Sequence, residues 1–149
     1  MLSIIYISFV YDGAFYTLWQ FKNKERFVVK SVNLMEKFGQ VNGYWRPHLV
    51  AEANGQHVRL AKLKNEFVWH SHEQEDELFI VIKGTLTVHF RDRDEIVKEG
   101  ELLVIPKGVE HMPEAQDEVL LVNITKAETT HTGDTQSDMT VKIDEMPRL

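Results

Sequence analysis

Residues 70–84 have the sequence HSHEQEDELFIVIKG, and residues 100–111 have the sequence GELLVIPKGVEH. The first stretch opens on His70 and His72, which one serine separates, and the second ends on His111. Side chains alternate between the two faces of an extended chain, so the imidazoles of His70 and His72 point to the same side. The first stretch therefore predicts a pair of histidines that can bind one ion.

Two further ligands are expected at the same place. Glu77 opens an apolar segment after a polar turn and can add a carboxylate, and the turn at residues 106–108 can return His111 to the same region. The predicted metal ligands are therefore His70, His72, Glu77 and His111. Three imidazoles and one carboxylate form a borderline to hard site with room for water or substrate. Such a site suits one divalent ion of iron, manganese, nickel, copper or zinc.

Short apolar segments with turn signals between them surround this site. The expected strands are residues 49–53, 56–63, 67–70, 78–82, 85–90, 102–105 and 119–124. Asn54 and Gly55 predict a tight hairpin turn, because both turn positions need positive φ. Asn33, followed by Glu36, predicts the start of a short helix that ends near Gly39. Many short strands between turns indicate an all-β sandwich or barrel.

The spacing in the two stretches resembles the paired signatures of the cupin superfamily. The first signature matches at His70, His72, Glu77 and Gly84. The second matches at Gly100, Pro106, Gly108 and His111. The resemblance implies an all-β fold, a double-stranded β-helix (jelly-roll) barrel with the metal inside, here with a short N-terminal helix. The chain resembles small single-domain cupins of the Cupin_2-like, sugar-phosphate-isomerase-like kind.

The chain departs from the family pattern at two positions, and one further residue competes with Glu77 as the carboxylate ligand. Lys64 and Ala115 stand where the family pattern has glycine and asparagine, and Asn65 beside Lys64 can take the left-handed turn conformation instead. Asp76 is the rival to Glu77, since the motif tolerates a shorter gap. Counting back from the glycine that ends the first signature favours Glu77.

The expected organisation has three parts. Residues 30–125 form the barrel, and the polar residues 126–149 form a tail that wraps it. Residues 1–29 form an N-terminal extension, for which a misassigned start codon and an extra strand are both explanations. The first ten residues are mostly apolar but lack the basic leading stretch of a signal peptide. They are also far short of the ~20 residues needed to span a bilayer.

Composition restricts the partners and the compartment. The net charge is −6 and the pI is about 5.6, which argues against nucleic acid and anionic membranes as main partners. The sequence has no cysteine, so any metal is held by nitrogen and oxygen ligands. The absence of cysteine also fits a reducing cytoplasm, where we expect the protein.

The residues of the substrate pocket are predicted from the alternation of side chains between the two faces of a strand. Phe79 shares the face of Glu77, and Met112 follows His111, so both are expected near the metal. Arg59 and Lys62 have opposite parity, so at most one of them faces inward. An inward Arg59 would suit a carboxylate substrate, whereas an outward one would belong to a solvated strand face. The other histidines are expected to have structural roles; they are His48, His57, His89 and His131.

Two functions remain open. The first is a metal-dependent enzyme of the dioxygenase, isomerase or lyase type, acting on a small organic substrate, with Glu77 exchanging between ligand and base. The alternative is a non-catalytic cupin that binds or senses a small ligand. Residues 78–82, 102–105 and 119–122 are apolar on both faces, so another surface must cover the second face. We expect a homodimer to do so, with the N-terminal segment as the competing cover.

Overall fold

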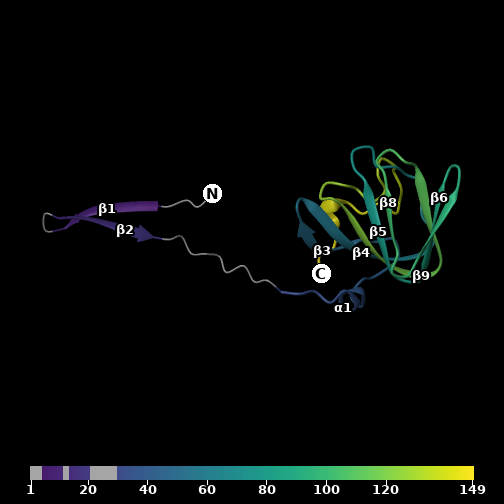
Figure 1. The fold of residues 1–149 in the computed structure, drawn as a ribbon, viewed down its shortest axis with the longest axis horizontal. Coiled ribbons are helices and arrows are strands. Elements are labelled where there is room, and N and C mark those ends of the chain that lie inside the picture. The colour runs from purple at the N-terminus through teal and green to yellow at the C-terminus, as the bar shows by residue number, and fades with distance from the viewer. Residues whose placement is uncertain (1–4, 12–13, 21–29) are drawn as a thin grey trace. The chain divides into compact units, whose positions relative to one another are not determined.

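A computed structural model describes residues 5–11, 14–20 and 30–149 (Figure 1). The chain divides into two compact units, residues 1–31 and 32–149. In the first unit, β1 (Ile5–Tyr11) and β2 (Ala14–Gln20) pair as an antiparallel hairpin. The expectations for the remainder of the N-terminal extension fall on residues that lie outside the described ranges.

The second unit is built almost entirely of strands. Its elements are α1 (Leu34–Phe38), β3 (His48–Ala53), β4 (Gln56–Glu66), β5 (Glu77–Lys83), β6 (Thr85–Phe90), β7 (Asp94–Lys98), β8 (Leu102–Ile105), β9 (His111–Lys126) and the 3-10 helix η1 (Ile143–Glu145). Every strand pair is antiparallel, in the order β3-β4-β9-β5-β8, and β6 pairs with both β7 and β9. No helix in the described part of the chain is long and apolar enough to cross a membrane.

Local sequence signals placed the turns correctly. Asn54 and Gly55 take positive φ, of 54° and 75°, and join β3 to β4 as predicted. The side chain of Asn33 accepts a hydrogen bond from the backbone N–H of Glu36 at 3.2 Å, which caps α1 at its expected start. Asn65 has φ of 65° and adopts the left-handed conformation that it was expected to be able to take beside Lys64.

Two expected strands need correction. Residues 67–70 form no strand; His70 and His111 instead make one isolated bridge, with backbone hydrogen bonds of 3.0 and 2.9 Å. The strand expected at residues 119–124 is far longer, because β9 starts at His111. Its first part pairs with β6 and its second part with β4 and β5, so a single strand crosses both halves of the barrel.

A strand was also missed at residues 94–98, which form β7. Its only buried side chain is that of Val97, so the segment has the polar composition of a turn. Pairing with residues 85–89 of β6 makes it a strand, from Thr85 opposite Lys98 to His89 opposite Asp94.

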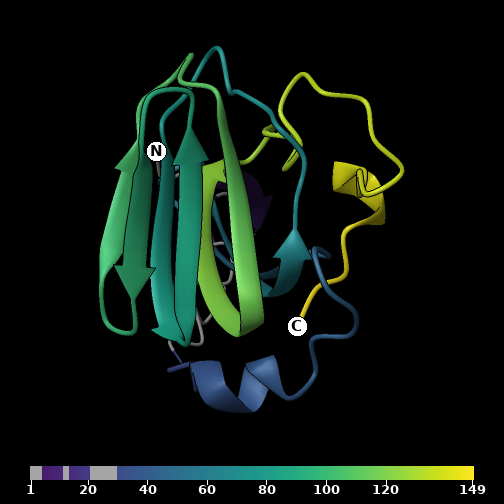
Figure 2. The same ribbon diagram turned by 90° about the vertical axis from the view of Figure 1, so that its right-hand side faces the viewer.

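The barrel interior holds the main hydrophobic core. Leu86, Val88 and Phe90 point into it as the alternation of β6 predicted. The second face of β5 and β9 is partly covered within the same unit, because Phe38 at the end of α1 and the nearby Val41 pack against it. Figure 2 shows α1 at the lower end of the strands.

The C-terminal segment lies against the barrel. Thr129 and Thr135 donate hydrogen bonds to Glu75 Oε1 and to the carbonyl of Trp69, at 2.6 and 3.0 Å. Further along, Val141 and Met146 pack on Leu49. The chain beyond β9 therefore covers the end of the barrel where residues 70–77 lie.

Candidate metal centre

The four predicted ligands come from two parts of the chain that the fold brings together. His70 and His72 lie in the extended segment that leads into β5, and Glu77 is the first residue of that strand. His111 is the first residue of β9 and is bridged to His70 through the backbone. All four side chains are buried, and one ligating atom from each lies within 4.8 Å of the others.

Glu77 Oε2 is the point on which the imidazoles converge. It lies 3.1 Å from His111 Nε2 and 3.3 Å from His72 Nε2. The other carboxylate oxygen, Oε1, accepts a hydrogen bond of 2.7 Å from the side-chain amide of Asn123. Asn123 therefore fixes the orientation of the carboxylate while Oε2 stays directed at the histidines.

Backbone carbonyls fix two of the imidazole rings. His70 Nδ1 lies 2.9 Å from the carbonyl of Val68, and His111 Nδ1 lies 3.0 Å from that of Val109. A carbonyl can only accept, so both Nδ1 atoms carry the proton and the neutral rings leave Nε2 with a lone pair. Metal-binding histidines are held in this way by their second nitrogen.

The donor set fits a divalent metal ion. With Nδ1 carrying the proton, His111 Nε2 presents a lone pair 3.1 Å from a carboxylate oxygen, an arrangement that a cation between the two atoms would stabilise. His72 Nε2 is buried and makes no hydrogen bond to any residue in the described ranges. Three nitrogens and one oxygen of this kind match the ligands of zinc, iron and their neighbours.

The pKa values of these groups follow from their mutual contacts. Burial on its own raises the pKa of Glu77, but the imidazoles of His111 and His72 outweigh it and hold that pKa far below its usual range. Burial lowers the pKa of His72, but the Glu77 carboxylate raises it overall. Burial and the neighbouring His111 lower the pKa of His70 to about 4. The carboxylate therefore stays ionised, as a ligand requires.

A small cavity of about 40 Å³ adjoins two of the ligands, His70 and Glu77. Its walls are mainly apolar and include Phe79 and Trp45. A volume of this size has room for one or two water molecules. His131, for which only a structural role was expected, also lines this cavity.

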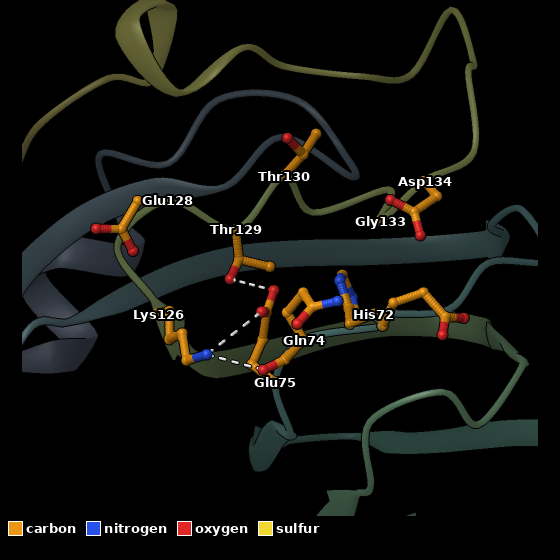
Figure 3. A pocket seen from close by; sticks show the side chains of 10 residues that line it. His72, Gln74, Glu75, Lys126, Glu128, Thr129, Thr130, Gly133 and Asp134 are labelled. Atoms are coloured by element: carbon orange, nitrogen blue, oxygen red, sulfur yellow. Dashed lines mark hydrogen bonds and ion pairs between the residues drawn. The ribbon is translucent and has the colours of Figure 1, made fainter.

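A second, wider hollow of about 390 Å³ lies between the turn before β5 and the C-terminal segment, and His72 reaches it (Figure 3). Figure 3 shows Lys126 and Thr129 extending from the C-terminal segment to the turn, where they contact Gln74 and Glu75. Nearly all of its lining residues are polar, and four of them are acidic: Glu73, Glu75, Glu128 and Asp134. This hollow contacts the site through His72, and the apolar cavity contacts it through His70 and Glu77.

The other residues predicted near the site, or as alternatives to its ligands, lie partly inside and partly outside the barrel. Arg59 is fully buried on β4 and faces the barrel interior, whereas Lys62 has the parity of the outer face. Met112 is half-buried and lies on the opposite face of β9 from His111. Asp76, the rival ligand, is exposed and accepts a hydrogen bond from the backbone N–H of Lys107 at 2.9 Å.

Comparison with known proteins agrees with this geometry. The Cupin_2 family, described as "Cupin domain", matches residues 56–125. A crystal structure of a cupin-2 domain containing protein from Shewanella frigidimarina is 44% identical, with a TM-score of 0.63, and the match covers 64% of this chain and 93% of that one. This chain belongs to the cupin superfamily.

Two further relatives support the assignment. Protein NMB1881 from Neisseria meningitidis is 30% identical, with a TM-score of 0.61, over 65% of this cupin and 99% of that chain. The uncharacterized protein YdbB of Bacillus subtilis is 37% identical over 83 residues, which are 55% of this chain and 74% of the relative. The expected fold class, an all-β jelly-roll barrel with a short helix, is confirmed.

Two residues of the site were missed by sequence reasoning. Asn123, which orients Glu77, lies in the middle of an apolar strand segment, LLVNIT, where a single asparagine was a detectable signal of a buried polar contact. His131 lies in a polar tail with no periodic pattern, so nothing local distinguished it from a surface histidine.

Proposed function

We propose that this cupin binds one divalent metal ion through His70, His72, Glu77 and His111 and acts as a metal-dependent enzyme on a small organic substrate. The observation that supports this most directly is the convergence of four buried ligating atoms within 4.8 Å, next to an apolar cavity. When bound, such an ion polarises a substrate oxygen or binds O2, which serves dioxygenase, isomerase or lyase chemistry.

The protein's own residues supply the remaining functions. Phe79 and Trp45 form part of the apolar wall of the cavity, and Asn123 holds the Glu77 carboxylate in place. Glu77 is the only acidic residue that lines the cavity among the described residues, so we assign it the second role of proton acceptor. The contacts with His111 and His72 lower the pKa of Glu77, so we assign it this role only when the carboxylate exchanges out of the ligand set and faces the substrate.

Substitutions at neighbouring acidic positions test this assignment. Glu77→Ala should lose most of the bound metal, whereas Asp76→Ala should retain it, because Asp76 contacts only the surface turn. Glu77→Gln keeps an oxygen ligand but cannot accept a proton, so it should retain part of the metal and lose turnover. If Asp76→Ala loses the metal and Glu77→Ala retains it fully, Asp76 is the ligand and Glu77 is not.

A screen for turnover decides between the two functions that the sequence left open. Oxygen uptake and product formation should be measured with small enols, thiols and phenols on metal-loaded protein. Turnover of one of these supports the enzyme. Saturable binding without turnover would favour a cupin that binds or senses its ligand.

We further propose that the protein is a homodimer located in the cytoplasm. Leu102 and Val104 on the edge strand β8 are 61% and 47% exposed, which leaves an apolar strip for a second copy to cover. The absence of cysteine fits a reducing compartment.

A further inference from the structure

His131 is a histidine beside the candidate centre that does not belong to the four ligands. It lies in the irregular chain after β9, beyond residue 125, where the family match ends. Its side chain lines the same apolar cavity as His70 and Glu77. The ring of Phe67 stacks on His131, with centroids 5.6 Å apart, and packs at right angles against His70 at 5.3 Å. His131 and two candidate ligands therefore border one small space.

The hydrogen-bonding capacity of the His131 ring is unfilled. Nδ1 and Nε2 are both shielded from solvent, and neither has a partner in hydrogen-bonding geometry within the described parts of the chain. A neutral imidazole carries one N–H and one lone pair, so a donor and an acceptor are both left over. Native proteins rarely leave buried polar groups in this state, so a molecule in the cavity is the expected partner.

The chain on either side of His131 is anchored to the barrel. Before it, Thr129 Oγ1 donates a hydrogen bond to Glu75 Oε1 at 2.6 Å. After it, Thr135 Oγ1 donates to the carbonyl of Trp69 at 3.0 Å. A side chain whose backbone is fixed on both sides needs little reorganisation to meet a ligand, as a catalytic group requires.

The surroundings of His131 keep its ring neutral. Burial lowers the pKa of His131 to about 4, and the nearby backbone of Met139 and Trp45 and the charge of Glu77 offset only part of this effect. At neutral pH the ring is therefore an imidazole and not an imidazolium. Such a ring can donate a hydrogen bond to an oxygen that develops negative charge without giving up its proton.

We propose that His131 is a further catalytic residue of this cupin, whose ring N–H donates a hydrogen bond to the substrate oxygen that becomes negatively charged in the reaction. The proposal rests on the proposed metal-dependent function and narrows its substrates to compounds whose reacting oxygen becomes an enolate or an alkoxide. The cavity of about 40 Å³ has room for one or two water molecules, so it receives one oxygen-bearing group and not a whole substrate.

Azide is a suitable probe, because it is small, is negatively charged and accepts hydrogen bonds. Titration of cobalt-loaded protein with azide, followed by visible absorption, measures the affinity of azide for the centre. His131→Phe keeps a ring that can stack on Phe67 but removes the N–H, so azide should bind at least about tenfold more weakly. His131→Gln restores a side-chain N–H donor and should recover part of the affinity.

His48→Phe is the matched control, because His48 is also buried but does not line the cavity. Its Nδ1 lies 2.9 Å from the carbonyl of Arg46, so this imidazole has a partner where His131 has none. The control should bind azide as the unaltered protein does.

Thermal stability separates a catalytic role of His131 from a structural one. Replacing unpaired buried polar atoms by an apolar ring of similar shape costs little, so His131→Phe should melt no lower than the unaltered protein. His48→Phe loses a made hydrogen bond and should melt lower. A lower melting temperature of His131→Phe with unchanged azide affinity would assign His131 a structural role and overturn the proposal. If both values fall, recovery of azide affinity in His131→Gln supports the proposal and its absence contradicts it.

Failure of this proposal and failure of the metal site give different results. Equal azide affinity in the unaltered protein and His131→Phe, or no azide binding by either, overturns the role of His131 and leaves the metal site standing. If the unaltered protein takes up no cobalt, the proposed metal-dependent function fails, and the role of His131 fails with it. Cobalt content is therefore measured for each variant, and His131→Phe should keep the full content because His131 is not one of the four ligands.

Discussion

Glu77 connects the candidate centre to the surrounding barrel. One oxygen faces His72 and His111, and the other is fixed by Asn123, so the carboxylate belongs both to the site and to the hydrogen bonds that position it. His111 and His72 lower the pKa of Glu77, and the Glu77 carboxylate in turn raises the pKa of His72. At neutral pH this arrangement keeps a negative charge directed at the position of the ion.

The pH dependence of metal binding follows from the imidazoles. A histidine must be neutral to bind metal, so protons compete with the ion. The pKa of His72 is raised above its ordinary value of 6.5, so His72 takes up a proton first as the pH falls. His70, whose pKa is about 4, stays neutral until far lower pH.

Metal affinity should therefore decrease between about pH 8 and about pH 5, by up to roughly tenfold per pH unit once His72 binds a proton in the metal-free protein. Competition with a chelator of known affinity measures this directly. An affinity that stays constant over the whole range would contradict ligation by three histidines.

The sequence identified the metal ligands, because their spacing matches two signatures. It missed the residues that only the tertiary fold brings to the site. The four ligands were predictable because alternation and the two signatures fix His70, His72, Glu77 and His111. Strand parity allowed only one of Arg59 and Lys62 to face inward, and only the pairing of Arg59 with Asn123 shows which one does. His131 reaches the cavity through a long irregular segment, whose course no local pattern specifies.

At the scale of elements, the C-terminal segment is the part that closes the barrel end. Gly133 is the residue that lets it lie close to the ligand segment, because a Cβ at this position would collide with the carbonyl oxygen of Ser71. Its φ of +53° also disfavours any other residue. A backbone contact therefore joins this segment to residues that flank His72.

Gly133→Ala should loosen the segment, whereas Gly55→Ala is a matched control with φ of +75° and nothing within 4 Å of the added carbon. The control should cost about 1–2 kcal/mol of stability from backbone strain alone. The Gly133 variant should lose at least twice as much and should show faster hydrogen exchange at residues 126–135. Equal losses in the two variants would show that the close approach to Ser71 does not hold the segment.

Turns and helix starts were predictable where one or two residues with a strong local preference determine them. Asn54 and Gly55 fixed a turn, and Asn33 fixed a helix start. The long strand β9 was predicted only in its apolar half, because residues 111–118 contain Pro113 and several polar side chains and become a strand only by pairing with β6 and β4. Tertiary pairing, rather than local propensity, decides such segments.

At the scale of the whole molecule, the outer face of the sheet determines assembly. Part of it is covered by Phe38 and Val41, so the second unit itself supplies part of the cover that the sequence assigned to another surface. The strip on β8 remains open, with Leu102 opposite Ile80 and Val104 opposite Leu78 on β5. An edge strand with such side chains is a typical contact between copies.

We expect the purified protein to sediment as a dimer that buries at least ~1,000 Å². The double substitution Leu102→Glu/Val104→Glu should give monomers, because it places two like charges on each side of the contact. Ile96→Glu, at an equally exposed apolar position on β7, should leave the dimer intact. A dimer that survives the double substitution would place the interface elsewhere on the molecule.

The central claim is that four residues, three from the first signature and one from the second, hold one metal ion. Elemental analysis of protein purified without chelator, beside the double variant His70→Ala/His72→Ala, tests it most directly. We predict about one divalent ion per chain in the unaltered protein and almost none in the variant, whose circular dichroism should still be that of a folded β-barrel because no strand includes either histidine. An undiminished metal content in a folded variant would contradict the assignment of the site.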